Sequence, residues 1–521
     1  MKTLLMTGVF SLLSIMDCSD NQLLFPTKET FFYASIDGSD SHGDGSKSNP
    51  WRTLAHALSK VQADKNHNIK LSAGYFVEKS YINVPSGVNI EGEGPELTVI
   101  RAHPSLFYKF PKWTLDKFLL SFSDAGGRQK IKNLTVDGNS KQLYGGIIVK
   151  NRRNVIIQNV KVQHCYYTGI WMWNTNNCRV TKVILENNAY GDERGASASI
   201  ILTAGSNLEV DNLQVDEEYG QALDVTSGKL HNVSIHHNNF SVSPKPNWVT
   251  ADGHQVPNIC VEFFNADLVN AKIYNNYFDN SLSIVKDSKA YKRTGVTTAR
   301  IYNNVFDLVK RAKGEGYGIE LTVDDVEINN NYFLGGSTGI VNWENAGAPL
   351  RQGWKIHHNV FYHLSSPYPT GIINFFQTGI NGALIYNNTA EMTGTSTVSF
   401  IEASNGGTVR NTKVENNLII NSNTDYMHYP NKFINLYNAS AYKVSVKNNF
   451  LEKMSLDKIN NVEYVNNIIG KSQILKSGKR PNPYYIPRPN SPLVDAGIVV
   501  GSSFLGAAPD IGAFEAELDK R

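Results

Sequence analysis

The middle of the chain alternates apolar and polar residues over short stretches, each of which ends in an asparagine-rich motif. One such unit, GYGIELTVDDVEINNNYF at residues 316–333, contains two alternating segments, 317–322 and 326–328. Alternation with a period of two is typical of a strand with one buried face. The unit therefore predicts two short strands, followed by the motif at 329–333.

The asparagine motif recurs along the chain. Its copies are IHHNNF (235–240), IYNNYF (273–278), IYNNVF (301–306), IHHNVF (356–361), IYNNTA (385–390), VENNLI (414–419) and VKNNFL (446–451). One asparagine, the third residue from the end of a copy, recurs as Asn276, Asn304, Asn331, Asn359, Asn388 and Asn417. The steps between these residues are 28, 27, 28, 29 and 29 residues. A nearly constant step indicates a repeating architecture.

A period of this length predicts a solenoid. Helical solenoids are excluded because no unit contains a stretch with a period of 3.6 residues, and the L-x-x-L-x-L frame of leucine-rich repeats is absent. The remaining architecture is all-β: a right-handed parallel β-helix, in which each coil consists of three short strands joined by turns. The recurring asparagines would then stack as an internal amide ladder that satisfies backbone groups at one turn.

The N-terminal sequence predicts that the protein is exported. Lys2 precedes an apolar run that is too short for a stable membrane anchor, so residues 1–18 have the pattern of a secretory signal. Cys18 and the residues after it resemble the start of a mature bacterial lipoprotein, but Asp17 replaces the expected small residue. We expect a bacterial protein that is either secreted or held at the periplasmic or outer surface by a lipid on Cys18. No other stretch is apolar enough to cross a membrane.

We expect the β-helix and its N-terminal cap over 30–469 and an extended tail, packed on the helix, over 470–521. A short amphipathic helix is predicted near 53–61, with one apolar face. The apolar residues of that face are Leu54, Ala57, Leu58 and Val61.

Both ends of the chain resemble secreted β-helix proteins of the pectate-lyase-like superfamily. The resemblance rests on YASIDGSD (33–40), GDGS followed by NPWRTL (43–54), SPLVDAG (491–497) and APDIGAFE (508–515). It implies that the N-terminal segment caps the open edge of the first coil. The superfamily includes hydrolases, lyases, epimerases and non-catalytic adhesins, so the resemblance implies an architecture and no single activity.

The amino-acid composition indicates which kinds of ligand the protein could bind. A net charge of +3 gives no reason to expect nucleic acid. Cys165, Cys178 and Cys260 lack the spacing of a metal site, so we expect no metal; Cys165 and Cys178 either pair or remain as buried thiols. The 25 Tyr, 23 Phe and 7 Trp residues suit sugar binding as well as stacked cores. We expect a monomer.

The strand that opens each coil of such a fold lines a long groove. Aligning these strands on the first apolar residue after a small one predicts which residues point outward. The alignment places acidic residues outward in the middle of the helix and tryptophans on either side of them. The acids are Asp224, Glu262 and Glu320; the tryptophans are Trp171, Trp173 and Trp343. It also turns Ile373 and Ile401 outward. Carboxylates flanked by exposed aromatic rings are typical of a polysaccharide-cleaving groove.

Spacing ranks the acid pairs. In this alignment Asp224 and Glu262 lie on adjacent coils with an offset of two residues, which gives a separation of about 8 Å. Inverting glycosidases place their carboxyl groups about 6.5–9.5 Å apart. Glu262 and Glu320 lie two coils apart, about 10 Å. We predict that Glu262 acts with Asp224 or Glu320 as acid and base; the alternative is that all three are solvated surface acids.

Two loops contribute candidate substrate-binding residues. The long insertion at 241–257 carries His254, which is either a groove residue or an ordinary surface histidine. The basic segment 286–293 carries Lys286 and Arg293, which would bind a carboxylate or sulfate on an acidic polysaccharide or simply be solvated.

The leading prediction is an exported glycoside hydrolase that cleaves a polysaccharide, expected to be acidic, without a cofactor. One alternative is a polysaccharide lyase, in which a basic residue abstracts a proton and calcium neutralises a uronate; Asp324 and Asp325 would then be calcium ligands rather than a turn cap. Another is a non-catalytic carbohydrate-binding surface protein that uses the same groove.

Overall fold

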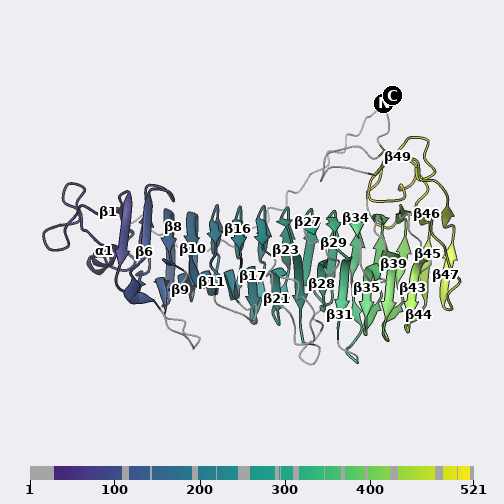
Figure 1. Cartoon of the computed structure of the whole chain (residues 1–521), viewed down its shortest axis with the longest axis horizontal. Helices are drawn as coiled ribbons and strands as arrows, with labels where there is room; N and C mark the ends of the chain where they lie inside the picture. The colour runs from purple at the N-terminus through teal and green to yellow at the C-terminus, as the bar shows by residue number, and fades with distance from the viewer. Residues whose placement is uncertain are drawn as a thin grey trace, which may run out of the picture.

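The computed structural model describes residues 29–107, 117–140, 143–190, 197–218, 220–243, 259–287, 293, 295–308, 316–344, 347–364, 370–392, 397–422, 432–475, 485–501 and 503–516. They form one elongated solenoid whose coils follow one another along its long axis (Figure 1). Its main sheet contains 44 strands. The expected signal segment and Cys18 lie outside the described residues.

The unit at 316–333 forms the coil that its pattern predicts. β28 (Tyr317–Leu321) and β29 (Val326–Asn329) are the two expected strands, and β30 (Tyr332–Gly335) follows the asparagine turn. Each of the three pairs in parallel with its equivalent in the next coil: β31 (Thr338–Trp343), β33 (Lys355–His357) and β34 (Val360–Leu364). The all-β parallel β-helix prediction is therefore confirmed.

The strands that open successive coils form what we call the groove sheet. Besides β28 and β31 it comprises β4 (Ile82–Asn83), β7 (Phe118–Phe122), β9 (Leu143–Lys150), β11 (Cys165–Asn176), β14 (Ala198–Ser206), β17 (Gln221–Thr226), β21 (Ile259–Phe264), β25 (Ser281–Val285), β35 (Thr370–Phe376), β39 (Thr397–Ser404) and β43 (Lys432–Tyr437).

The second strand of each coil forms the second sheet, which contains β29 and β33. Its other members are β2 (His67–Leu71), β5 (Asn89–Glu91), β8 (Gly126–Asp137), β10 (Arg152–Gln163), β12 (Arg179–Thr181), β15 (Glu209–Asp211), β19 (Ser234–His236), β23 (Ala271–Tyr274), β26 (Ala299–Tyr302), β37 (Leu384–Tyr386), β41 (Lys413–Glu415), β45 (Val444–Lys447) and β47 (Val462–Val465).

The third sheet contains β30 and β34, and the long strands β8 and β10 continue into it. Its other members are β3 (Gly74–Glu78), β6 (Thr98–Ala102), β13 (Ile184–Glu186), β16 (Gln214–Glu217), β20 (Asn239–Val242), β24 (Tyr277–Phe278), β27 (Val305–Leu308), β38 (Thr389–Met392), β42 (Leu418–Asn421), β46 (Phe450–Glu452) and β48 (Ile468–Ile469). The remaining strands are β1 (Thr30–Ala34), β18 (Lys229–His231), β22 (Asp267–Val269), β32 (Arg351–Gln352), β36 (Gly379–Asn381), β40 (Thr408–Arg410), β44 (Ser440–Tyr442), β49 (Ile474–Leu475) and β50 (Ile486–Pro487).

The predicted asparagine ladder is present. The Oδ1 of Asn304 accepts from the backbone N–H and the side-chain amide of Asn276, both at 3.0 Å, while its own amide donates to the carbonyl of Ile273. The same contacts repeat from Asn238 to Asn467, so the ladder extends beyond both ends of the evenly spaced series Asn276–Asn417. Each rung therefore satisfies backbone groups that the turn leaves unpaired.

The residue before each ladder asparagine explains why the motif is doubled. Asn303, Asn330 and His358 have φ near +55°, in the left-handed region that asparagine and histidine tolerate better than most residues. The first residue of the pair makes the turn and the second makes the ladder.

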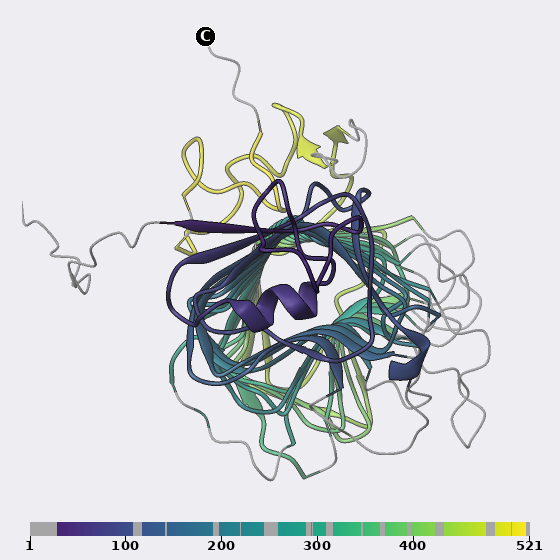
Figure 2. The ribbon, with the colours of Figure 1, turned by 90° about the vertical axis from the view of Figure 1, so that its left-hand side faces the viewer.

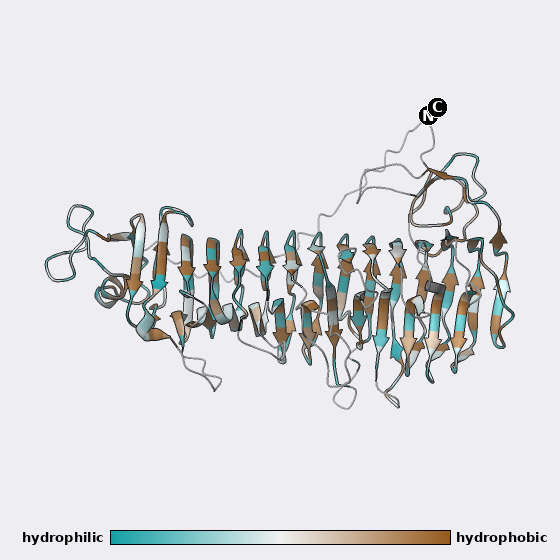
Figure 3. Ribbon diagram, viewed as in Figure 1, coloured by the Kyte–Doolittle hydropathy of each residue, from teal (hydrophilic) through white to brown (hydrophobic). Residues whose placement is uncertain are grey.

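The core is stacked as the repeat requires. The phenylalanines that close several motifs lie inside, ring on ring: Phe278 and Phe306 have centroids 4.8 Å apart, and Phe306 and Phe333 4.9 Å. Apolar residues recur on the strands along the whole solenoid (Figure 3). Cys165, Cys178 and Cys260 are buried thiols that form no disulfide. Of the two alternatives for Cys165 and Cys178, the structure therefore has the buried thiols and not the pair.

The N-terminal end is closed by α1 (Leu54–Lys60), which lies across the first coil (Figure 2). Thr53 caps it and its buried face is the predicted one. A 3-10 turn, η1 (Pro104–Leu106), follows β6. In the described part of the chain no helix is long and apolar enough to span a bilayer.

The C-terminal segment packs along the outside of the third sheet (Figure 1). Tyr485, Leu493 and Ile511 are buried against Leu418 and Phe450. A short antiparallel pair, β49 with β50, belongs to this segment.

Candidate active site

Asp224, Glu262 and Glu320 occupy a single row of the groove sheet. Asp224 pairs in register with Glu262, Glu262 with Ser283, and Ser283 with Glu320. The predicted offset of two residues between Asp224 and Glu262 is therefore wrong: the two backbones are only about 4.8 Å apart. The sequence alignment had set Ile259, the first apolar residue of its strand, against Leu223, whereas Val261 is the residue that pairs with Leu223.

Glu262 is held by the preceding coil. Gln221 donates its side-chain amide to Glu262 Oε2 across 2.5 Å, and Gln221 Oε1 is buried without a hydrogen-bond partner. Burial raises the pKa of the Glu262 carboxyl, and the bond from Gln221 offsets only part of that rise. Sequence reasoning missed Gln221; its place at the start of β17, three residues before Asp224, was the available signal.

Glu320 is held by two hydroxyl groups. Ser283 donates to Glu320 Oε2 across 2.7 Å and Tyr317 donates to the same oxygen across 3.0 Å. Burial raises the pKa of Glu320 despite these two bonds, and the charges of Glu262 and Glu344 raise it further. Both glutamates are partly exposed, whereas the Asp224 side chain is buried.

Of the three predicted tryptophans, Trp343 lies nearest to Glu320 in strand register. Its side chain is 48% exposed, and it lies two residues after Val341, which pairs with Glu320. Its ring packs edge-to-face against Tyr317, with the ring centroids 5.0 Å apart. A large exposed ring beside a carboxyl is a suitable platform for a sugar.

Trp171 and Trp173 lie upstream on the same sheet and are partly buried. Their rings stack with centroids 5.7 Å apart, and Trp171 donates to Thr203 across 3.1 Å. Lys150 lies over Trp173, 4.6 Å from its centroid. These rings are less open than the sequence predicts.

The predicted cationic residues are engaged in ion pairs. Lys286 contacts Asp267, and Arg293 contacts Asp325 at 2.6 Å. Asp324 accepts from the backbone N–H of Gln352, as a turn cap does. The structure therefore gives Lys286 and Arg293 carboxylate partners within the chain. His254 lies outside the described residues.

The row continues toward the C-terminus to a fourth acid that sequence reasoning missed. Val341 pairs with Asn374, and Asn374 pairs with Glu402. The prediction that Ile373 and Ile401 point outward is wrong: both are buried, in register with inward-facing Ile340. In β35 the residue that pairs with Ile340 is Ile373, one position after the first apolar residue, Ile372, and a register shift at the start of the β35–β39 pairing displaces β39 further.

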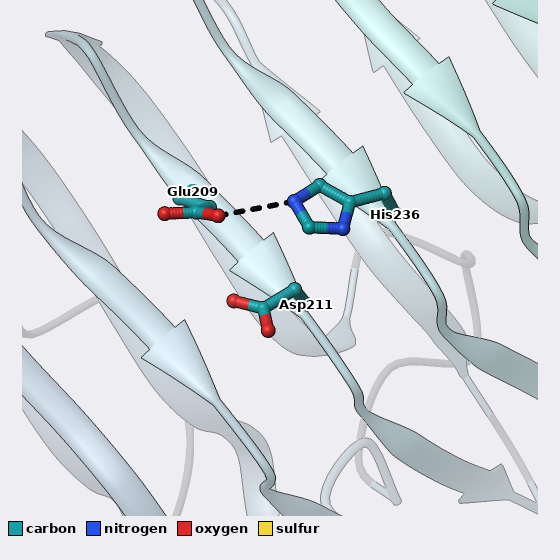
Figure 4. Close-up of side chains that lie close together, drawn as sticks. All are labelled: Glu209, Asp211 and His236. Carbon is teal, nitrogen blue, oxygen red and sulfur yellow. Dashed lines mark hydrogen bonds and ion pairs between the residues drawn. The ribbon is translucent and has the colours of Figure 1, made fainter.

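One cluster has the composition of a metal site. Glu209, Asp211 and His236 lie together on the second sheet, with Glu209 and His236 in contact at 3.1 Å (Figure 4). However, the Arg179 guanidinium makes two hydrogen bonds to Asp211, at 2.7 and 3.0 Å, and so already supplies the cation. The same glutamate–histidine contact occurs at Glu327 and His357, where Asn329 replaces the aspartate. We interpret the cluster as a structural ion-pair network.

A shallow polar cavity of about 490 Å³ lies near the start of the helix, lined by Arg101, Asp137, Asn139, Ser140, Gln163 and His164. Burial opposes the ionisation of Asp137, but hydrogen bonds from His164 and the Asn139 N–H and the charge of Arg101 lower its pKa to about 2. The Asp137 carboxylate is thus neutralised within the protein.

The fold has counterparts among known proteins. The family model described as right handed beta helix region matches residues 120–306. The tailspike protein of E. coli bacteriophage HK620, solved in complex with a pentasaccharide, is 14% identical with a TM-score of 0.51, over 83% of this chain and 78% of that chain. Pectate lyase Pel9A is 15% identical with a TM-score of 0.32, over 94% of this chain and 98% of that chain. No curated protein matches the sequence.

The family match lies within the solenoid, and the likeness to the tailspike covers most of it. Both concern architecture. The chain is a right-handed parallel β-helix protein, and its resemblance to the pectate-lyase-like superfamily is a resemblance of fold.

Proposed function

We propose that this protein is an exported glycoside hydrolase that cleaves a polysaccharide lying along the groove sheet. The observation that carries the proposal is the row Glu262–Ser283–Glu320 with its two partly exposed carboxyl groups, whose pKa values are raised. Perturbed carboxyls in a groove are typical of acid–base catalysis. A solved protein of similar fold, the tailspike, binds a pentasaccharide.

Glu262 and Glu320 form the proposed catalytic pair. Two coils separate their backbones by about 10 Å, close to the spacing that leaves room for a water between inverting carboxyls. Asp224 is buried and lies about 4.8 Å from Glu262, so we assign it a supporting role.

The hydrogen bonds divide the roles. Two hydroxyl donors on one oxygen of Glu320 favour its ionised form, so Glu320 is the base that takes a proton from the attacking water. Glu262 has a single side-chain donor, Gln221, and is the acid that protonates the leaving glycosidic oxygen. Water adds to the anomeric carbon as the C–O bond breaks, with inversion. Trp343 would bind a sugar ring beside Glu320.

The test is cleavage of a panel of neutral and acidic polysaccharides, including xylan, polygalacturonate and alginate. A hydrolase produces new reducing ends without the ultraviolet absorbance of unsaturated sugars, whereas a lyase produces that absorbance. Glu262→Gln and Glu320→Gln should each abolish cleavage while the fold, checked by circular dichroism, is unchanged. Full activity in both variants would exclude the pair, and binding without any product would indicate a carbohydrate-binding protein.

A further inference from the structure

Two and three coils beyond Glu320, the groove sheet carries polar groups that the proposed catalytic pair does not use. We propose that Glu402, Asn374 and Ser399 form a second saccharide-binding subsite, which takes hydroxyl groups of the same polysaccharide at a distance from the cleavage point. The inference rests on the proposed function for its substrate class.

The position of this subsite follows from strand register. Glu320 pairs with Val341, Val341 with Asn374, and Asn374 with Glu402. Three coil steps of about 4.8 Å place Glu402 about 14 Å from Glu320 along the solenoid axis. A polysaccharide that lies along the row would therefore reach both places, whereas a single sugar would not.

These side chains retain unused hydrogen-bonding capacity. Glu402 is 5% exposed, yet its Oε2 has no hydrogen-bond partner, and neither have Asn374 Oδ1 and Ser399 Oγ. The side-chain amide N–H of Asn374 donates to Thr370 Oγ1 across 2.9 Å. A buried polar atom without a partner costs about 1–3 kcal/mol, so three of them in one place require an explanation.

A glycine keeps Glu402 and Ser399 close together. A Cβ atom added at Gly371 would lie 2.7 Å from Glu402 Cβ and 3.0 Å from Ser399 Oγ. Any larger residue at this position would push the two polar side chains apart. The close approach of the backbone is therefore part of the subsite.

The chemistry of the three groups defines the ligand. A carboxyl oxygen and an amide oxygen accept hydrogen bonds, and a serine hydroxyl both donates and accepts. Sugar hydroxyls complement all three. Burial raises the pKa of Glu402 to about 7, with a partly opposing hydrogen bond from Asn435. At neutral pH the carboxyl is thus partly protonated, which suits a neutral hydroxyl better than a cation.

The experiment measures binding, by calorimetry, of dimers to octamers of galacturonate and of xylose to the full-length Glu262→Gln protein. Adding Glu402→Gln should weaken octamer binding about tenfold and leave dimer binding unchanged, because only the octamer spans both places. Gly371→Ala should act in the same direction. Glu415→Gln, on the second sheet, is the matched control and should change neither.

The other possible outcomes distinguish the subsite, a cation site and the proposed hydrolase from one another. Equal octamer affinity with and without Glu402→Gln overturns the subsite, even if the protein cleaves its substrate. Calcium binding that Glu402→Gln abolishes, with no change for oligomers, also overturns it in favour of a cation site. Glu402-dependent octamer binding without any cleavage by wild type would reject the proposed hydrolase and keep the subsite. Absence of binding by every oligomer rejects both.

Discussion

Ser283 donates a 2.7 Å hydrogen bond to Glu320 of the next coil, and Tyr317 donates to the same oxygen. Both bonds favour the ionised carboxylate, whereas burial opposes it. The charge state of Glu320 therefore depends on two neighbouring hydroxyl groups that can be removed one at a time.

Ser283→Ala and Tyr317→Phe should each raise the pKa of Glu320 further, because each removes a donor to its charged form. A base with a higher pKa is ionised only at higher pH, so the acidic limb of the kcat/KM profile should move to higher pH. At neutral pH the loss should be about 1 kcal/mol, roughly fivefold. An unchanged acidic limb would contradict the assignment of Glu320 as the base; Ser440→Ala is the control.

Trp343→Ala should weaken binding of long oligosaccharides by about 1 kcal/mol, roughly fivefold, since the indole is exposed beside Glu320. Trp343→Phe should restore part of the affinity because it keeps an aromatic face. Affinity electrophoresis in polysaccharide-containing gels measures both. Tyr442→Ala, which removes an exposed ring from β44, should have no effect. Equal retardation of wild type and Trp343→Ala would remove this ring from the proposed groove.

The ladder predicts an unequal response within one asparagine pair. Asn331→Ala removes the acceptor for the backbone and side-chain N–H groups of Asn304 and the donor to the carbonyl of Ile301. Each buried group left unpaired costs about 1–3 kcal/mol, so the urea midpoint should fall clearly. Asn330→Gly should change it little, because glycine adopts the positive φ of that residue readily. Similar losses in the two variants would contradict the division of roles.

The repeat made the fold predictable because ladder, turn and core residues all recur in one motif. The register of the groove sheet was less predictable. A bulge adds one residue to a strand and reverses which side chains face outward, and no hydrophobic pattern marks it when both neighbours are apolar. At Ile372 and Ile373 both side chains are buried, so the pattern fits two registers.

That ambiguity decided which site residues were found. Glu262 and Glu320 were predicted to face outward from the alternation within their own strands, and the two-residue error in the register of Glu262 left its face unchanged. Glu402 was missed because the alignment turned Ile401 outward in its place. The partners Gln221 and Tyr317 could not be predicted, since they reach their carboxyls along or across coils through side-chain conformations that spacing alone does not specify.

Asp137 predicts how stability depends on pH. Its carboxylate accepts from Arg101 Nε at 3.0 Å and from the Asn139 N–H at 2.9 Å, and its pKa is lowered from 3.8 to about 2. A carboxyl group whose pKa is lower in the folded state stabilises the fold, and this contribution is complete at pH values above the pKa of the unfolded state. That contribution is lost as the pH falls from 3.8 to about 2.

Asp137→Asn should therefore reduce the free energy of unfolding by about 2 kcal/mol at neutral pH. The difference from wild type should shrink as the pH falls through the acid range, because the wild-type carboxylate becomes protonated there. Urea denaturation followed at a series of pH values measures both effects. The exposed Asp216→Asn is the control and should leave the midpoint unchanged. A deficit in Asp137→Asn that stays constant down to about pH 2 would show that Asp137 contributes through packing and not through its charge.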